Sequence, residues 1–106
     1  MKEKHYYVYI ITNRFNTVLY IGVTGDIYRR MAEHRQGTGE GFSKKYHLNK
    51  LIYLEETTDV WAALEREKQL KNWHRKWKMD LIRTLNPSLK DLSPNMLDED
   101  AGSSPA

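Results

Sequence analysis

The sequence predicts one α+β domain in which helices flank a three-stranded sheet. Two runs of aromatic and β-branched residues, at 6–12 and 17–23, are joined by a short polar segment, and such a pair is typical of a β-hairpin. Apolar residues recur at helical spacing within 26–36 and again after residue 59, with a third apolar run at 50–56 between them. Because 106 residues suffice for one modest core of two layers, we expect these elements to form a single domain.

Alternation along the hairpin strands sorts their side chains onto two faces. We expect one face to collect the tyrosines of both strands: Tyr7, Tyr9, Ile11, Val18, Tyr20 and Gly22. The opposite face carries Tyr6, Val8, Ile10, Leu19, Ile21 and Val23. Since a two-stranded hairpin is barely stable alone in water, later segments of the chain must cover this second face.

The segment after the hairpin begins with residues that favour a helix start. The side-chain oxygens of Thr24 and Asp26 can cap a helix over 26–36. Three glycines within 37–41 are unfavourable in a helix or a central strand and predict a mobile loop. Residues 42–48 can then add a turn or two of helix, with Lys44 and Lys45 pointing outward, before the third strand.

A longer helical stretch follows the third strand. A cap cluster at 57–59 precedes a helix that we expect to reach about His74. A second apolar set spaced by four continues the pattern: Trp73, Trp77, Leu81 and Leu85. The pattern leaves open whether the helix bends near 74–76. We expect the folded domain to span residues 1–92 and the acidic, turn-rich segment 93–106 to be disordered.

Composition restricts the classes of function. The chain has no Cys, which excludes disulfide frameworks, thiol nucleophiles and thiolate zinc sites. We see no signal peptide and no apolar run that could span a bilayer, so a cytoplasmic protein with no membrane partner is expected. Net charge is +3, but without the acids Asp91, Asp98, Glu99 and Asp100 of the last sixteen residues, 17 basic and 10 acidic side chains give +7. This excess favours a polyanionic partner, although many small basic domains have none.

Ionisable side chains interrupt the predicted apolar stripes. On the first helix, Arg30 and His34 lie one turn apart on the line that should meet the sheet. Glu67 falls at the centre of the stripe formed by Val60, Ala63, Leu64, Leu70 and His74. Because a buried carboxylate needs a cation, a metal or water, we expect Glu67 to join Arg30 and His34 on the tyrosine-bearing face. A structural Arg30–Glu67 ion pair, capped by tyrosine hydroxyls, is the alternative that spacing alone allows.

Basic side chains elsewhere are candidate phosphate contacts. They are Lys44, Lys45, Lys71, Arg75, Lys76 and Lys78. A solvated charged face is the equal alternative for this set. The tryptophans at 61, 73 and 77 could stack on bases, although tryptophans at helical spacing are more often part of a core.

Two triplets and their supporting residues resemble a known family. Tyr7-Val8-Tyr9 is followed, after ten intervening residues, by Tyr20-Ile21-Gly22, and this pair resembles the signature triplets of the GIY-YIG nuclease superfamily. Arg30, Glu67 and the later Asn86-Pro87 stand in the family order. The first triplet departs from the family pattern, because its first position holds Tyr where Gly is usual. A single triplet is weak evidence, but the ordered set is specific.

The resemblance covers about residues 5–92 and is to the small stand-alone bacterial, UPF0213-like, members. It implies an α+β fold with a three-stranded antiparallel sheet flanked by helices. It also implies metal-dependent hydrolysis of phosphodiesters. By the family mechanism, Tyr9 and Tyr20 would activate or orient water, Arg30 would stabilise the phosphorane charge, and Glu67 would hold a divalent metal.

Elementary chemistry favours the same residue types. A guanidinium matches the charge of a phosphorane through paired N–H donors, and one carboxylate can suffice for Mg²⁺ or Mn²⁺, which keep several waters. A tyrosine, with an ordinary pKa of about 10, must be made more acidic before it accepts a proton near neutrality. We expect Tyr20 to be the base, Tyr9 its hydrogen-bonding partner, and His34 to share the proton transfer.

The combined prediction is a metal-dependent endonuclease of low sequence specificity that acts on nucleic acid, with DNA as the expected substrate and repair or processing as the expected setting. A catalytically silent nucleic-acid-binding module is the first alternative, and a structural or partner-binding domain is the second. The joint presence of Tyr9, Tyr20, Arg30 and Glu67 favours the nuclease.

Overall fold

A computed structural model describes residues 4–38 and 41–93 of the chain. In this part, three strands, β1 (Tyr6–Thr12), β2 (Leu19–Thr24) and β3 (Lys50–Thr57), form an antiparallel sheet in the order β2-β1-β3. The predicted α+β class and three-stranded antiparallel sheet are therefore confirmed. The hairpin is placed as expected, except that β2 begins two residues later than its apolar run.

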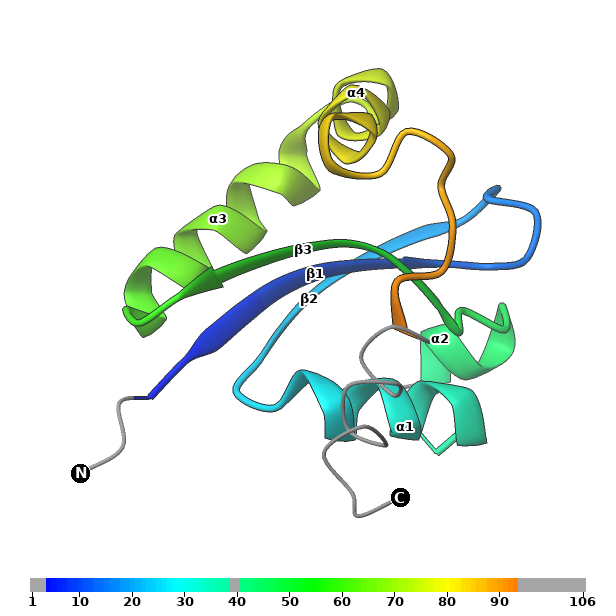
Figure 1. Cartoon of the computed structure of the whole chain (residues 1–106), viewed down its shortest axis with the longest axis horizontal. Coiled ribbons are helices and arrows are strands. Elements are labelled where there is room, and N and C mark those ends of the chain that lie inside the picture. The colour runs from blue at the N-terminus through cyan, green and yellow to red at the C-terminus, as the bar shows by residue number, and fades with distance from the viewer. Residues whose placement is uncertain (1–3, 39–40, 94–106) are drawn as a thin grey trace, which may run out of the picture.

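Two pairs of helices enclose the sheet. Helices α1 (Ile27–Gln36) and α2 (Gly41–Lys45) lie on one side, and α3 (Val60–Asn72) and α4 (Arg75–Leu85) lie on the other (Figure 1). The molecule thus has three layers rather than the two that we expected. The reason is that both faces of the hairpin are apolar enough to require a cover.

Local chemistry sets the ends of α1. The Asp26 side chain accepts a hydrogen bond from the backbone N–H of Arg29 at 3.1 Å, which satisfies one of the free donors of the first turn. Gly37 ends the helix in the left-handed region with φ of 73°, a conformation that costs a glycine little. The predicted mobile loop at 37–41 falls partly outside the described residues.

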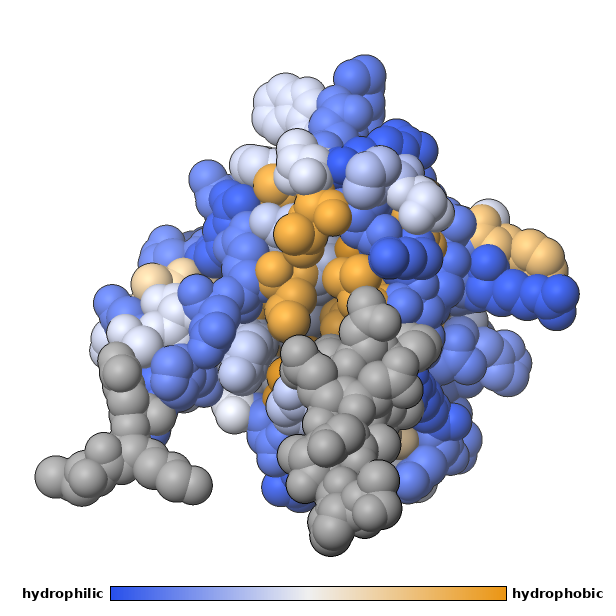
Figure 2. Space-filling model, in the orientation of Figure 1, coloured by the Kyte–Doolittle hydropathy of each residue, from blue (hydrophilic) through white to orange (hydrophobic). Residues whose placement is uncertain are grey.

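The sheet carries a separate apolar core on each face. The tyrosine-bearing face packs against α1 and the segment that follows α2, through Tyr9, Ile11, Ile27, Met31, Leu48 and Leu51. The opposite face packs against α3 and α4 through Val8, Ile10, Ile21, Ile52, Tyr53, Ala63, Leu70 and Ile82. The predicted alternation of the hairpin is therefore confirmed. In Figure 2, apolar residues show mainly at the level of the sheet, between the hydrophilic outer surfaces of the helical layers.

The structure corrects the expected placement of α3. We expected this helix to bring Glu67 onto the tyrosine-bearing face, but Ala63 and Leu70 bury themselves against the opposite face. The helical path also breaks at Trp73 and His74, whose ψ angles are 149° and 150°, so the bend that the pattern left open near 74–76 is present and two helices form. Because α4 starts in a new direction, the spacing by four across the break no longer defines one face.

Several residues of the predicted stripes are exposed as a result. Leu64, Trp77 and Leu85 are 41%, 54% and 55% exposed, and His74 is also exposed. Ile82, which we had not placed in a stripe, is fully buried in α4. The stripes were therefore wrong at these positions, because α3 buries Ala63 and Leu70 but not Leu64, and α4 buries Ile82 after the break.

A polar anchor ties α3 to β3. The guanidinium of Arg66 donates to both carboxylate oxygens of Glu55, at 2.9 to 3.1 Å, and the Tyr53 hydroxyl donates to the same carboxylate at 2.5 Å. Burial, followed by the hydrogen bond to Glu55, raises the pKa of Tyr53 to about 12. Burial alone would raise the pKa of Glu55, but hydrogen bonds from Arg66 and Tyr53 outweigh it and lower that pKa from its ordinary value of 4.5.

The segment after α4 returns to the sheet. The side-chain amide of the buried Asn86 donates to the carbonyl oxygens of Ile52 and Lys90 at 3.1 and 2.8 Å, and Asp91 accepts from the backbone N–H of Leu51 at 3.0 Å. Asp91, which we assigned to the acidic end by charge, is thus part of the fold. Beyond residue 93, the predicted disordered segment lies outside the described residues.

Within the residues described, no helix has the length and apolar character needed to span a membrane.

Candidate active site

Tyr9 in the central strand and Tyr20 in the edge strand β2 share one face of the sheet. The register pairs Tyr9 with Gly22 and Ile11 with Tyr20, and the two tyrosine rings lie 6.5 Å apart between centroids. Tyr9 is 1% exposed, whereas Tyr20 is half-buried. Tyr20 is therefore the more accessible tyrosine of this pair, and Tyr9 is enclosed within the fold.

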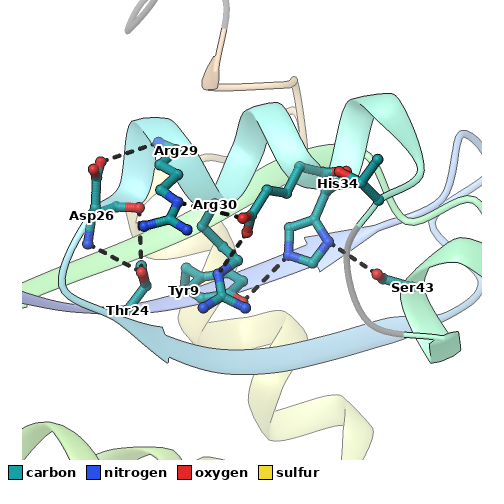
Figure 3. A network of polar contacts seen from close by, with 9 residues as sticks. Tyr9, Thr24, Asp26, Arg29, Arg30, His34 and Ser43 are labelled. Atoms are coloured by element: carbon teal, nitrogen blue, oxygen red, sulfur yellow. Dashed lines mark hydrogen bonds and ion pairs between the residues drawn. The ribbon is translucent and has the colours of Figure 1, made fainter.

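His34 connects the two tyrosines to α2. It projects from α1 toward the sheet (Figure 3), where its Nε2 lies 3.3 Å from the Tyr9 hydroxyl and its Nδ1 lies 3.0 Å from the Ser43 hydroxyl. The imidazole ring is also 6.4 Å from the Tyr20 ring, edge to face. Tyr9, His34 and Ser43 are all buried, so the hydrogen bonds on both nitrogens hold the imidazole at a defined orientation.

Arg30 lies one turn before His34 on α1 and extends toward the same side of the sheet (Figure 3). Its side chain is 31% exposed, and its Nε lies 3.5 Å from a carboxylate oxygen of Glu33. Arg30 also lines a polar cavity of about 320 Å³ with Thr24, Gly25, Asp26, Arg29 and Glu33. A long, partly solvated ion pair is weak, so Arg30 retains N–H donors that can turn to an anion in this cavity.

Glu67 lies on α3, in the helical layer on the other side of the sheet. Its side chain is 23% exposed, and Lys71, one turn further along α3, lies 3.4 Å from its carboxylate. In the described part of the chain, Arg30 pairs with Glu33 and Glu67 with Lys71, so the alternative of a structural Arg30–Glu67 ion pair is wrong. Each charge is instead balanced within its own helix.

A groove joins the two layers at the open edge of β2. It has a volume of about 330 Å³ and is lined by Leu19, Tyr20, Ile21, Phe42, Lys71 and Lys78. Lys71 thus lines the same groove as Tyr20. The Tyr20 side chain belongs to one face of the sheet, whereas α3, which carries Lys71, covers the opposite face. In the described part of the chain, β2 has no further strand on this side, so the groove lies along an open edge of the sheet.

Comparison with known proteins matches this arrangement. A model of the GIY-YIG catalytic domain matches residues 5–80. The chain belongs to the GIY-YIG catalytic domain family. This membership makes the protein a nuclease-type hydrolase in its general class, with nucleic acid as the class of substrate.

Named relatives of the GIY-YIG protein are similar over most of their own length. A UPF0213 protein of Syntrophus aciditrophicus is 37% identical over 78 residues, which cover 73% of this chain and 88% of the relative. A UPF0213 protein of Staphylococcus saprophyticus is 34% identical over 80 residues, which cover 76% and 95%. The resemblance to small UPF0213-like members is therefore confirmed.

A solved structure shows the same fold. The solution NMR structure of a UPF0213 protein from Bacillus halodurans aligns with a TM-score of 0.54 at 23% identity. The alignment covers 82% of this chain and 92% of that chain. The three-stranded sheet with its flanking helices is thus the fold of a UPF0213 protein as well.

The donor set of the GIY-YIG protein suits a hard divalent ion held mainly by water and substrate. No cluster of three or more His, Cys, Asp or Glu side chains that could hold a metal occurs among residues 4–38 and 41–93, so a closed protein cage is not built here. Glu67, however, presents a partly exposed carboxylate whose one ion-pair partner in this region is a lysine at 3.4 Å. A single carboxylate of this kind fits Mg²⁺ or Mn²⁺, which keep several waters and bind phosphate oxygens.

The predicted phosphate contacts differ in whether they line the groove beside Tyr20. Lys71 and Lys78 line the groove with Tyr20, and Lys44 is exposed on α2. Lys45 lies with its ammonium 5.4 Å from the Tyr46 ring centroid, while Lys76 pairs with Asp80 at 2.9 Å.

Arg75 has a structural role in the free protein. Its guanidinium donates to the backbone carbonyl oxygens of Asn16 and Thr17 at 2.6 and 3.3 Å. It thereby braces the β1–β2 turn against α4. We therefore rank Lys71 and Lys78 above Arg75 as phosphate contacts.

Ser43 and Phe42 are site residues that sequence reasoning missed. Both lie on α2, a single helical turn. The expectation that Lys44 and Lys45 point outward leaves the preceding residues to face the sheet, which is the signal that could have placed them. The partners, His34 for Ser43 and Tyr20 for Phe42, could not be inferred because they are distant in the chain.

Proposed function

We propose that this GIY-YIG protein is a divalent-metal-dependent endonuclease that hydrolyses phosphodiester bonds of nucleic acid, DNA in the first instance, with low sequence specificity. The observation that carries the proposal is the position of Tyr20. This half-buried phenol borders the buried Tyr9–His34 network on one side and the lysine-lined groove on the other. A phosphate in the groove would meet the partly exposed phenol of Tyr20, behind which the buried Tyr9–His34 network lies.

In the proposed reaction, Tyr20 first gives its hydroxyl proton to solvent and then, as the phenolate, orients a water molecule and takes a proton from it as the water oxygen bonds to phosphorus. The bond from phosphorus to the leaving strand oxygen then breaks with its electron pair on that oxygen, which takes up a proton from solvent water. Tyr9 and His34 hold the Tyr20 region in one geometry, because their contacts are buried and their hydrogen bonds fix the imidazole. His34, whose Nε2 lies 3.3 Å from the Tyr9 hydroxyl, is placed to pass a proton to or from this network.

Arg30 would stabilise the charge that develops on phosphorus. Its guanidinium is partly solvated in the free protein and presents several N–H groups in one plane, which match two phosphorane oxygens at once. The weak pair with Glu33 keeps the guanidinium near the cavity without occupying all of its donors. In this proposal, Glu33 orients the Arg30 side chain.

Glu67 would hold the metal in this proposal. A bound Mg²⁺ or Mn²⁺ supplies charge stabilisation to the phosphate oxygens and makes a bound water more acidic. The Lys71 ammonium, which now balances Glu67, is then available to a phosphate of the substrate strand.

Low sequence specificity is supported by the chemistry of the basic side chains near the site. Ammonium contacts to phosphates position a nucleic acid but read no base edge. Lys71 and Lys78 line the groove and would therefore act on any sequence.

The proposal is tested by incubating the purified protein with labelled DNA and RNA in single-stranded, duplex and branched forms. Each substrate is tested with Mg²⁺, with Mn²⁺ and with a chelator. Cleavage that requires the metal supports the proposal. Binding without cleavage under every metal condition would favour the alternative, a catalytically silent binding module.

A further inference from the structure

Three aromatic rings, those of Tyr20, Phe42 and Tyr46, lie in successive contact. The Tyr20 and Phe42 rings lie 5.9 Å apart between centroids at an interplanar angle of 31°, and Phe42 lies 4.8 Å from Tyr46 at 49°. Phe42 and Tyr46 are 46% and 39% exposed. Burying large aromatic rings is favourable, so two rings left in water beside a reactive tyrosine offer a surface for a flat apolar ligand.

The groove next to these aromatic rings has both apolar side chains and ammonium groups in its lining. Leu19, Ile21 and Phe42 contribute apolar surface, while Lys71 and Lys78 contribute positive charge. Its volume of about 330 Å³ is at the lower end of the range for small-ligand sites. A nucleotide has the complementary composition, because it joins a flat base with an apolar face to a negatively charged phosphate.

The contacts of Tyr20 indicate where such a nucleotide would lie relative to the reacting phosphate. Tyr20 lines the groove and also lies against His34, and Lys71 of the groove pairs with Glu67. The groove therefore begins where the reacting phosphate of the proposed nuclease would lie. A base in it would come from a nucleotide adjacent to that phosphate.

We propose that this groove holds an unpaired nucleobase of the substrate strand, stacked on Phe42 beside the phosphate that is cut. The proposal rests on the nuclease function proposed above and specifies its substrate class. A base inside a duplex has both faces covered by its neighbours, so only an unpaired or extruded base can offer a face to Phe42. The preferred substrate is then a strand that is unpaired at the cleavage position, with any of the four bases accepted, because every base has a face that stacks.

The base-binding step is tested without cleavage, in chelator, with duplexes that carry one bulged nucleotide. One duplex has a normal bulged base, a second has an abasic bulge that keeps the backbone distortion, and a third is fully paired. We expect the wild-type protein to bind the base-bearing bulge roughly ten-fold more tightly than the abasic one, which equals about 1.4 kcal/mol and is within the range for base–aromatic stacking.

Matched substitutions assign that preference to Phe42. Phe42→Leu keeps apolar bulk but loses the flat ring, so the ten-fold preference should disappear, whereas Phe42→Trp keeps a ring and should retain it. Phe15→Leu is the control, because Phe15 is 72% exposed in the β1–β2 turn outside the groove. The thermal midpoint of each variant shows that it is folded. Equal binding of both bulges by the wild-type protein, or a preference that survives in Phe42→Leu, would overturn the proposal.

A parallel cleavage assay with Mg²⁺ separates the two proposals. If the base-bearing bulge is preferred in binding but no substrate is cut, the nuclease proposal fails and the base-binding groove stands. If paired and bulged duplexes are cut equally fast and bound equally well, the nuclease stands and the groove proposal fails. Faster cleavage at the base-bearing bulge, lost in Phe42→Leu and kept in Phe42→Trp, supports both.

Discussion

The ring of Tyr9 lies directly over the backbone of Gly22, so that a Cβ atom at position 22 would stand 2.5 Å from the Tyr9 hydroxyl oxygen and 2.6 Å from its Cζ. The two residues are paired across β1 and β2. Because Tyr9 is buried, its ring has little room to retreat. The glycine of the second triplet is therefore required by the tyrosine of the first.

Gly22→Ala is the first prediction. The added methyl group must displace Tyr9 or shift the strands, and overpacking of this kind costs about 1–3 kcal/mol, which should lower the thermal midpoint by several degrees. Gly25→Ala is the control, since the nearest atom to its Cβ would be 3.9 Å away. Calorimetry of the two variants checks the prediction, and equal midpoints would show that Tyr9 moves aside freely.

Arg30 can be tested by a substitution that keeps its charge. Lysine retains the charge and much of the aliphatic stem but loses the planar fork, so Arg30→Lys should be nearly as inactive as Arg30→Ala. We expect both to lose about 3–4 kcal/mol of transition-state stabilisation, or two to three decades in cleavage rate. Wild-type cleavage by Arg30→Lys, together with a lower thermal midpoint for Arg30→Ala, would instead make the arginine structural.

The metal role of Glu67 predicts a loss that is specific to catalysis. Glu67→Gln removes a ligand charge but preserves shape, so cleavage with Mg²⁺ should fall by roughly 100-fold or more while the fold and nucleic-acid binding remain. Glu65→Gln is the control, because Glu65 is exposed on the same helix. The assay compares single-turnover rates, and a Glu67→Gln rate equal to that of the control would contradict the metal role.

The groove lysines should dominate the salt dependence of binding. Each phosphate contact releases condensed counterions and adds about 0.9 to the slope of log affinity against log salt. Lys78→Ala should therefore reduce the magnitude of this slope by about one unit, because Lys78 lines the groove. Lys76→Ala should change it less, since the Lys76 ammonium already pairs with Asp80 at 2.9 Å. A larger change for Lys76 would place the nucleic acid on the outer face of α4.

The Glu55 anchor predicts a pH dependence of stability. The pKa of Glu55 is lower in the folded protein than its ordinary value of 4.5, so the carboxylate stabilises the fold above the unfolded pKa, and this contribution is lost as pH falls through the folded pKa. Glu55→Gln should therefore lower the thermal midpoint by several degrees at pH 7, because hydrogen bonds to charged groups contribute about 1.5–3 kcal/mol.

The same difference should shrink as the pH is lowered below about 4. Glu65→Gln, at an exposed position, should show little difference at any pH. Thermal midpoints of the wild-type protein and both variants between pH 3 and pH 7 check this. A constant gap for Glu55→Gln across the range would mean that ionisation of Glu55 does not contribute.

Sequence alone determined the features that depend on neighbouring residues. The hairpin and the two faces of its strands follow from alternation, and the start of α1 follows from the capping oxygen of Asp26. These features were predictable because their interactions join residues a few positions apart. The ordered set of triplets, arginine and glutamate likewise lies in the chain itself, which is why the family could be recognised before the structure was known.

Only the tertiary structure decided how the elements combine. Helical spacing shows which face of α3 is apolar, but both sides of the sheet are apolar enough to accept it, so the layer that holds Glu67 could not be derived. The break at Trp73 and His74 depends on α4 packing Ile82 into the core. The contacts of His34 with Ser43 and of Tyr20 with Phe42 arise from the docking of α2, because a single helical turn has no stable position until the sheet and α1 provide a surface for it.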